Sequence, residues 1–341
     1  MVFSFEVPAT TRGIGVSLCT GAGEKTIFRL STVTVFKVQR GGAHLFLDND
    51  TNRSVDQYTG RLLLDEANQE AWRKYARLAL GMDGPESAFR LLICPAKEEV
   101  FQDLYQHRRA QITPIDQVVD ICAGPQLLFP LEALRRDRES SYSTVDTHWS
   151  DYGAKIGAIE YLRSVGLSRV VGCLPDDFYQ RKVYGDLGGK VDGGQTGVFM
   201  TLAKGYRFGT PGFDNGIGNH GRIWTYTNDD AEVQGTLVIF GDSFSVSLSA
   251  ILASVFRRVV YCYTAAGLDP EILEVERPGY VLAQTNQRFV VNSPGVAVSV
   301  FRQVMQKVSV LDDKERLSMR GRFGEDCPEP YYAKRMSGLL R

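Results

Sequence analysis

The sequence has no long apolar run. Its first residues, Met1 to Pro8, are interrupted by the charged Glu6 and by Pro8, so they lack the apolar region of a secretory signal peptide. No stretch elsewhere approaches the roughly 20 apolar residues that a membrane-spanning helix needs. The sequence as given therefore predicts a protein without a membrane-spanning segment, located in the cytoplasm, or in the periplasm if a leader was removed before residue 1.

The chain also has almost no net charge. Its 39 basic and 40 acidic residues are interspersed and give a formal charge of −1. Binding to nucleic acid or to an anionic membrane normally requires clustered Lys and Arg, so neither partner is expected. The hydrophobic, aromatic and charged fractions, 43%, 11% and 23%, are those of an ordinary globular protein.

Cysteine is scarce and lacks the spacing of a metal site. No two of the six cysteines form a CxxC pair, and Cys94 and Cys262 lie inside apolar runs. We therefore expect reduced, mostly buried thiols rather than a disulfide framework or a zinc site. The cysteines are Cys19, Cys94, Cys122, Cys173, Cys262 and Cys327.

The sequence has no nucleotide-binding loop, although it contains 34 glycines. Residues 173–234 are rich in glycine but hold neither GxxxxGK[ST] nor a GxGxxG motif between a strand and a helix. A segment this long without clear periodicity is usually functional. We interpret it as substrate-binding loops or a β-rich insertion.

The rest of the chain alternates between strand-like and helix-like segments. Apolar, β-branched runs predict strands, and apolar residues at helical spacing predict helices between them. This alternation predicts an α/β fold with a doubly wound parallel sheet. The predicted strands are residues 89–94, 117–122, 236–240, 258–264 and 279–286, with a short strand within 41–50; the predicted helices are residues 66–80, 98–109, 151–165 and 245–256, and residues 296–310 complete the core.

Three segments are expected along the chain. Residues 1–40 contain two runs rich in branched residues, 15–19 and 26–38, separated by a glycine-rich turn, which predict an N-terminal β-hairpin. Residues 41–310 form the predicted α/β domain, with the glycine-rich insertion inside it. Residues 311–341 are polar and charged and are predicted to be a peripheral tail.

One strand-turn-helix segment carries the candidate nucleophile. Thr236 is followed by four apolar residues, 237–240, Gly241 permits a sharp turn, and the predicted helix begins at Ser245. Such a turn places the Ser243 hydroxyl at a helix N-terminus, where N–H groups and the helix dipole stabilise an oxyanion. The alternative is a serine that only caps the helix, so a partner base is needed to decide.

A serine nucleophile needs a base, and the base needs an orienting carboxylate. Of the four histidines, His148 has Asp146 two residues before it. In an extended segment residues i and i+2 point to the same side, so this carboxylate can fix the imidazole tautomer. The predicted triad consists of Asp146, His148 and Ser243. The alternative interpretation of the Asp-x-His motif is a solvated loop or an N-terminal cap. A metal site is disfavoured because no third His or Cys lies at ligand spacing.

In this order, the motifs resemble those of the SGNH-hydrolase-like polysaccharide O-acetyltransferases, the alginate acetyltransferase (AlgX/AlgJ) family. The resemblance is carried by Asp146-Thr-His-Trp149, then Gly185-Asp-Leu187, then Gly241-Asp-Ser-Phe244. It extends over roughly residues 40–290. Members of this family place Asp-x-His before the serine, as this chain does.

The resemblance implies a doubly wound α/β/α domain in which Ser243 is the nucleophile, His148 the base and Asp146 its partner. It implies acetyl transfer through an acyl-serine onto a carbohydrate hydroxyl in bacterial polysaccharide or glycan biosynthesis. A carbohydrate O-acetyl esterase of the SGNH type and a non-catalytic glycan-binding subunit are the alternatives. No bound cofactor or metal is expected, since the acetyl donor, acetyl-CoA or an acetylated carrier, is a substrate. Expected partners are a carbohydrate acceptor and other polysaccharide-synthesis proteins.

Further residues are predicted to bind the oxyanion or the substrate. The oxyanion donors are the Ser243 N–H and one side-chain amide, that of Asn286 or Asn228, although either asparagine can instead form a turn. Trp149 is predicted to stack on a sugar ring, or else to pack against the start of its helix. The remaining predicted substrate-binding residues are Arg288 and Lys97.

Overall fold

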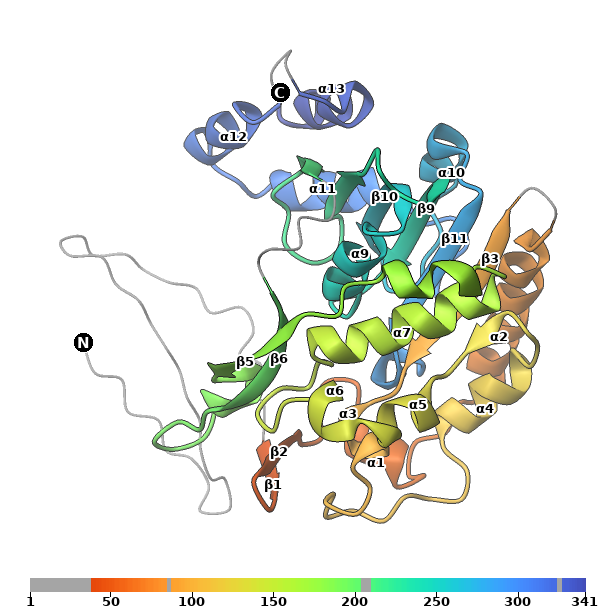
Figure 1. Ribbon diagram of the computed structural model, residues 1–341, viewed down its shortest axis with the longest axis vertical. Helices are drawn as coiled ribbons and strands as arrows, with labels where there is room; N and C mark the ends of the chain where they lie inside the picture. The colour runs from red at the N-terminus through yellow and green to blue at the C-terminus, as the bar shows by residue number, and fades with distance from the viewer. Residues whose placement is uncertain (1–37, 85–86, 204–209, 324–326) are drawn as a thin grey trace.

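The computed structural model describes residues 38–84, 87–203, 210–323 and 327–341. At its centre lies a seven-stranded sheet (Figure 1). In sheet order the strands are β4 (Leu127–Leu128), β3 (Ala88–Cys94), β11 (Tyr280–Asn286), β9 (Val233–Gly241), β10 (Phe256–Tyr263), β8 (Ile223–Thr227) and β7 (Thr210–Asp214). The first five are parallel to one another, whereas β8 pairs antiparallel with β10, and β7 antiparallel with β8.

Helices cover both faces of this sheet, which is why its central strands are continuous apolar runs. Along β9, Val238 and Phe240 pack into one buried cluster, and Leu237 and Ile239 into the other, because successive side chains point to opposite faces. The first cluster contains α2 (Glu66–Ala79), α4 (Pro114–Ile121), α10 (Pro270–Glu276), α11 (Val300–Val308) and α13 (Pro330–Leu339). The second contains α5 (Leu131–Arg136), α7 (Asp151–Ser164) and α9 (Ser245–Leu252), and Figure 1 shows α7 crossing in front of the sheet.

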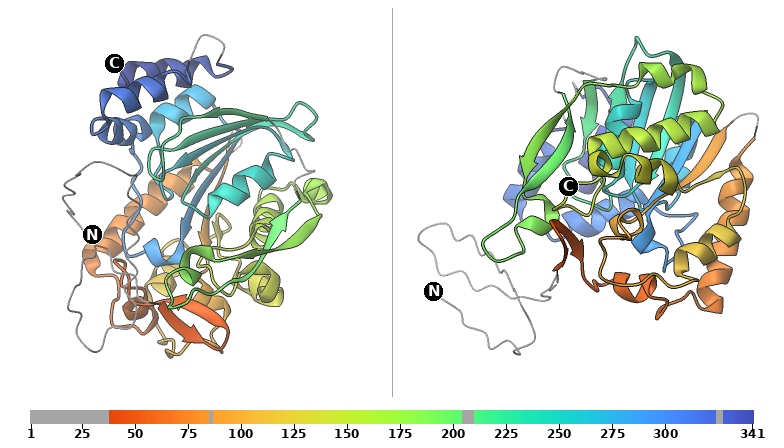
Figure 2. Two further views of the ribbon diagram at one scale, coloured as in Figure 1. Left: turned by 90° about the vertical axis from the view of Figure 1, so that its left-hand side faces the viewer. Right: turned by 60° about the horizontal axis from the view of Figure 1, so that its bottom comes forward.

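Two antiparallel hairpins lie beside the sheet at one end of the molecule (Figure 2). They are β1 (Val38–Gly41) with β2 (His44–Leu47), and β5 (Phe178–Val183) with β6 (Gly197–Leu202). The amide of Gln195, just before β6, donates a hydrogen bond to the Ala43 carbonyl (2.7 Å) and so joins the two hairpins. The remaining elements are α1 (Ser54–Tyr58), α3 (Lys97–Val100), α6 (Arg138–Ser141), α8 (Gly185–Gly188), α12 (Asp313–Arg320) and 3-10 turns at Leu80–Met82, Ser168–Cys173 and Gln287–Phe289.

The predicted α/β class is confirmed, and most predicted elements are present. Ser150 caps α7, since its hydroxyl accepts a hydrogen bond from Gly153 N (3.1 Å). Predicted strands 89–94, 236–240, 258–264 and 279–286 correspond to β3, β9, β10 and β11; predicted helices 66–80, 151–165 and 245–256 correspond to α2, α7 and α9, and 296–310 contains α11.

The strand predicted at residues 117–122 is wrong, because this stretch belongs to α4. Thr113 and Asp116 form a capping box at the start of this helix, and Pro114 occupies a position that suits proline. The apolar residues Ile115 and Val118 then face the core at helical spacing. The capping signals outweigh the β preference of the two adjacent valines.

The helix predicted at residues 98–109 is also wrong, because α3 ends at Val100. The chain then folds back, so that Arg109 Nε lies 2.8 Å from a carboxylate oxygen of the buried Glu99. In a continuous helix these residues would be about 15 Å apart along the axis. A tertiary ion pair therefore accompanies the turns that replace the predicted helix.

Two further segments differ from the sequence prediction, and a third lies almost wholly outside the described residues. The sheet is not entirely parallel, because the glycine-rich residues 173–234 supply its antiparallel strands β7 and β8 as well as the β5–β6 hairpin. The predicted peripheral tail forms α12 and α13, and Tyr332 and Met336 of α13 are buried in the core. The predicted hairpin within residues 1–40 lies almost wholly outside the described residues.

Across the part of the chain that the structure describes, no helix is both long enough and apolar enough to cross a membrane.

Candidate active site

Ser243 lies in the turn between β9 and α9, at the carboxyl end of the central strands. Gly241 ends β9, and a Cβ atom at this position would overlap the hydroxyl of Ser245, so only glycine fits. The helix α9 begins at Ser245, two residues after Ser243. The predicted strand-turn-helix geometry is therefore present.

The carboxylate of Asp242 holds this turn in place. Asp242 is fully buried, and burial raises its pKa although hydrogen bonds to the carboxylate oppose the shift. Those hydrogen bonds are donated by Phe244 N (2.9 Å), Gln284 Nε2 (2.9 Å) and Asn286 N (2.6 Å). One donor belongs to the turn and the other two belong to β11, so the turn is fixed relative to the neighbouring strand.

The three predicted triad residues form one hydrogen-bonded chain. His148 Nε2 lies 2.8 Å from Ser243 Oγ, and His148 Nδ1 lies 2.9 Å from Asp146 Oδ1. The same carboxylate oxygen accepts a hydrogen bond from His148 N at 2.8 Å. Asp146 therefore orients both the backbone and the ring of His148, and the ring nitrogen that faces the serine is left to accept its proton.

The carboxylate stabilises the protonated form of the imidazole. Burial by itself lowers the pKa of His148, but the hydrogen bond and the charge of Asp146, with a contribution from Asp186, raise it above its ordinary value. Burial likewise opposes ionisation of Asp146, but its hydrogen bonds and the charge of His148 hold its pKa below the usual range. Each partner thus favours the ion pair that would form when the base takes up a proton.

Asp186 is a second carboxylate beside this pair, and its role was not predicted from the sequence. Its oxygens accept hydrogen bonds from Thr147 N (2.7 Å) and Thr147 Oγ1 (2.5 Å), and one of them lies 3.8 Å from His148 Nδ1. The motif around it, Gly185-Asp-Leu187, carries part of the family resemblance. Asp186 therefore steadies the backbone between the two triad residues.

Asp146, His148 and Asp186 also have donor atoms within 4.8 Å of one another, a spacing at which a metal ion can bind. Their atoms are already used in other contacts, since His148 Nδ1 faces Asp146 and both oxygens of Asp186 face Thr147. The observed hydrogen bonds favour an acid–base network over a metal centre.

A cleft of about 440 Å³ opens over the triad. Its walls come from the triad itself, from the start of α9 and from the β5–β6 hairpin, which contributes Arg181 and the directly opposed Phe199. Arg181 is exposed, and its side chain forms no hydrogen bond or ion pair with any residue that the structure describes. These two residues had no motif to mark them, because only the fold of the hairpin brings them to Ser243.

Tyr263 is another neighbour of the serine that sequence reasoning missed. It is the last residue of β10, and interactions with the side chain and the backbone of Ser243 lower the pKa of its hydroxyl. Burial, together with the charge of Asp242, nevertheless raises the pKa of Tyr263 above its usual value. The group is therefore a protonated hydroxyl at neutral pH, positioned beside the candidate nucleophile.

Of the two predicted oxyanion asparagines, the structure does not place Asn228 at the site. Its amide donates a hydrogen bond to Ala253 O (3.0 Å) at the far end of the eight-residue α9, about 12 Å along the helix axis from its start. Asn286 is buried next to Asp242, but its amide nitrogen faces Cys94 O (3.4 Å) and its oxygen accepts from Arg288 N (3.0 Å). Both asparagines stabilise local backbone, which was the alternative interpretation.

Trp149 lines the cleft but is almost fully buried. Its indole N–H donates to Phe244 O (3.0 Å), and its ring packs so closely on Gly157 of α7 that a Cβ there would lie 2.8 Å from it. The packing interpretation therefore describes the ring better than stacking on a sugar.

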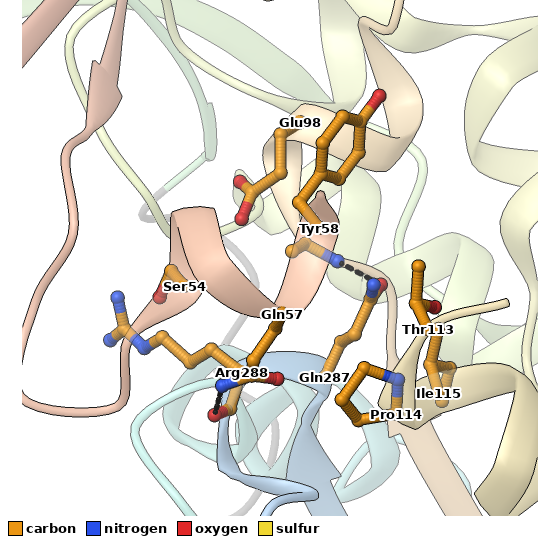
Figure 3. Close-up of a pocket in the computed structure, with 10 residues that line it drawn as sticks. Ser54, Gln57, Tyr58, Glu98, Thr113, Pro114, Ile115, Gln287 and Arg288 are labelled. Atoms are coloured by element: carbon orange, nitrogen blue, oxygen red, sulfur yellow. Dashed lines mark hydrogen bonds between the residues drawn. The ribbon is translucent and has the colours of Figure 1, made fainter. Parts of the chain in front are cut away.

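The other two predicted substrate residues lie outside the lining of this cleft. Arg288 borders a separate pocket of about 10 Å³, together with Ser54, Gln57 and Glu98 (Figure 3). That volume holds about one water molecule. The positive charge of Arg288 opposes protonation of His148, so it acts on the triad from outside the cleft. Lys97 is buried, with 2% of its surface exposed, and cannot contact a substrate in this structure.

Together these features define a class of protein: a mostly parallel α/β fold with a Ser-His-Asp hydrogen-bonded chain at the carboxyl end of its sheet, under an open cleft. The same fold is found in Bacillus cereus PatB1, with a TM-score of 0.52 and 10% identity over 79% of this chain and 99% of PatB1. A structure of PatB1 with a sulfonyl adduct gives a TM-score of 0.50 and 11% identity over 76% of this chain and 97% of the other.

The O-acetyltransferase domain of Pseudomonas putida AlgJ matches 83% of this chain and 98% of that domain, with 14% identity and a TM-score of 0.45. No protein-family model matches the sequence, and no curated protein matches it.

Proposed function

We propose that this protein is an O-acetyltransferase that moves an acetyl group through an acyl-serine onto a carbohydrate hydroxyl. The observation that carries the proposal is the continuous hydrogen-bonded chain from Asp146 through His148 to Ser243, at the floor of a cleft. An unrelated serine and histidine would not be expected to align in this way with a half-buried carboxylate behind them.

In the first half of the reaction Ser243 becomes acylated. His148 Nε2 removes the proton from Ser243 Oγ, which attacks the carbonyl carbon of the acetyl donor. Asp146 stabilises the imidazolium that results, consistent with the raised pKa of His148. The imidazolium then gives its proton to the leaving group as the bond to the donor breaks.

The oxyanion of this step needs hydrogen-bond donors beside Ser243. The backbone N–H of Ser243 is one, as the turn geometry predicts. We infer that the hydroxyl of Tyr263, in place of the predicted asparagine amide, is the second, because its pKa responds to both the side chain and the backbone of Ser243 and it therefore lies beside them.

In the second half an acceptor hydroxyl takes the acetyl group. His148 again acts as base, removes the proton from the hydroxyl and returns it to Ser243 Oγ as the acyl bond breaks. A cleft of about 440 Å³ lies within the range of small-molecule sites. An aromatic ring and a guanidinium in its wall, Phe199 and Arg181, suit a sugar, which presents both an apolar face and hydrogen-bond acceptors.

The experiment that tests the proposal is covalent labelling. The purified protein and Ser243→Ala are each treated with an aryl acetate and with a sulfonyl fluoride, and intact masses are measured. We expect one acetyl or one sulfonyl adduct on the wild type and none on Ser243→Ala. If neither protein gains mass, or if both do, Ser243 is not an activated nucleophile.

Two further outcomes separate the transferase from its alternatives. A transferase holds the acetyl group until a sugar is added and then forms an acetylated sugar, whereas an esterase releases acetate steadily into water. If Ser243→Ala supports glycan modification as well as the wild type does, the protein is a non-catalytic glycan-binding subunit. The acetyl donor is identified by testing acetyl-CoA and acetylated carriers in the same assay.

A further inference from the structure

Lys97 is a buried ammonium without a carboxylate in contact. Its side chain is 2% exposed, and its Nζ donates hydrogen bonds to two backbone carbonyls, Leu45 O and Thr144 O, each at 2.9 Å. Within the described residues no carboxylate oxygen lies at ion-pair distance from this Nζ. A lysine placed so far from water normally has a paired charge, so its position calls for an explanation.

The two carbonyls tie the triad segment to the β1–β2 hairpin. Leu45 belongs to β2, and Thr144 lies two residues before Asp146. The Thr144 carbonyl also accepts a hydrogen bond from Leu45 N at 2.7 Å, so it is held by two donors. Lys97 thus fixes the backbone immediately before Asp146.

The same segment is also held by α8. Leu187 N donates to Val145 O at 3.0 Å, and Asp186 N donates to Asp146 Oδ2 at 3.2 Å. Residues 144–147 belong to no helix or strand, so these contacts take the place of a regular ladder. Removing the Lys97 side chain would release one side of the support for Asp146.

The charge of Lys97 also acts on the carboxylates behind His148. Burial lowers the pKa of Lys97 to about 7, and the charges that most oppose this shift are those of Asp146 and Asp186. These two carboxylates also raise the pKa of His148, which Arg288 opposes. The pKa values of Lys97 and His148 therefore both respond to the charges of this carboxylate pair. The other ionisable groups near Lys97 are Glu98, Glu139 and the buried His44.

We propose that Lys97 is a positioning residue, which holds the backbone of Asp146 and offsets part of the negative charge of Asp146 and Asp186, and so limits the proton affinity of His148. The inference rests on the proposed function, because it gives His148 the role of base. It assigns to Lys97 a role in tuning the triad instead of the substrate contact predicted from the sequence.

Two variants separate the charge of Lys97 from its hydrogen bonds. Lys97→Gln retains an N–H donor without the charge, and Lys97→Met removes both. Lys74→Met, on the exposed side of α2, is the matched control for loss of one positive charge. The first measurement is the pKa of His148 in the resting protein, from NMR of histidine-labelled samples, with the resonance assigned by its loss in His148→Gln.

We expect the pKa of His148 to rise by roughly half a unit to one unit in Lys97→Gln and Lys97→Met, because a neighbouring positive charge has been lost. It should be unchanged in Lys74→Met. The acid limb of the pH profile for acetyl transfer should move upward by the same amount. Only Lys97→Met should increase amide hydrogen exchange in residues 144–147, because it alone lacks a donor for the carbonyls.

An unchanged pKa of His148 in a folded Lys97→Gln would overturn the proposal, and loss of activity without that shift would show a structural role only. If both variants fail to fold, the Lys97 resonance is titrated in the wild type and in Asp186→Asn. The pKa of Lys97 should fall in Asp186→Asn, and no change refutes the charge coupling. These titrations need no turnover, so they are independent of whether Ser243 is labelled.

Discussion

Replacing Asp146 with asparagine tests whether its carboxylate orients the base. In the wild type every hydrogen-bond partner of this carboxylate is a donor: His148 N at 2.8 Å and His148 Nδ1 at 2.9 Å on one oxygen, and Asp186 N at 3.2 Å on the other. Asparagine has only one acceptor oxygen. In either orientation its NH₂ group therefore faces a backbone N–H group.

The expected loss of kcat depends on which way the asparagine amide is oriented. If its NH₂ faces the ring, His148 Nδ1 must accept, the proton moves to Nε2, and the nitrogen beside Ser243 can no longer act as a base. If the oxygen faces the ring, the NH₂ is opposed to Asp186 N and the charge that supports the imidazolium is lost. We expect kcat to fall by about 10⁴-fold, as the same change does in a well-studied Ser-His-Asp triad.

The assay is acetyl release from an aryl acetate, with kcat and KM measured separately and folding checked by thermal unfolding. Asp176→Asn, which neutralises an exposed carboxylate paired with Lys155, is the control and should change kcat by less than about twofold. A folded Asp146→Asn that retains kcat within about tenfold of the wild type would refute the orienting role.

Three other results are expected. Gly241→Ala should lower the free energy of unfolding by about 1–3 kcal/mol in a denaturant titration, because its methyl would overlap Ser245; a loss under about 0.5 kcal/mol would contradict the tight turn. The acid limb of kcat/KM should lie above pH 6.5, since the base must be neutral and the pKa of His148 is raised; a limb below pH 6.5 would show that another group titrates. His148 should also stabilise the folded protein fully below pH 6.5, and this stabilisation is lost as the pH rises through the pKa of His148 in the folded state. Arg181→Ala should raise KM for the sugar roughly tenfold, and an unchanged KM would exclude Arg181 from binding. The control is Lys182→Ala, on the other face of the hairpin, which should leave KM unchanged.

Local signals predicted elements well where backbone preference and burial agree. The run at 237–240 is apolar at every position and belongs to β9, and Ser150 marks the start of α7 through its own side chain. Prediction failed where another signal outweighed the local backbone preference. The adjacent valines of residues 117–122 favour a strand, but a capping box starts a helix before them.

The candidate site likewise contains residues that motifs predicted and residues that only the structure revealed. Gly241-Asp-Ser243 and Asp146-Thr-His148 each contain a recognisable half of the chemistry, and the structure brings these halves together across 95 residues of sequence. Tyr263, Arg181 and Asp186 had no predicted role, because each reaches the site only through the pairing or position of its own element.

The sequence by itself determined the α/β class, the turn that holds Ser243 and the pairing of Asp146 with His148, because each depends on residues that are neighbours along the chain. The tertiary structure decided which tyrosine lies near the serine, and which basic residue faces the cleft. It placed Arg181 in the wall of the cleft and buried Lys97 against the carbonyls of Leu45 and Thr144. A residue's type fixes what its side chain can bond, but long-range packing fixes whether the side chain meets solvent, substrate or another part of the chain.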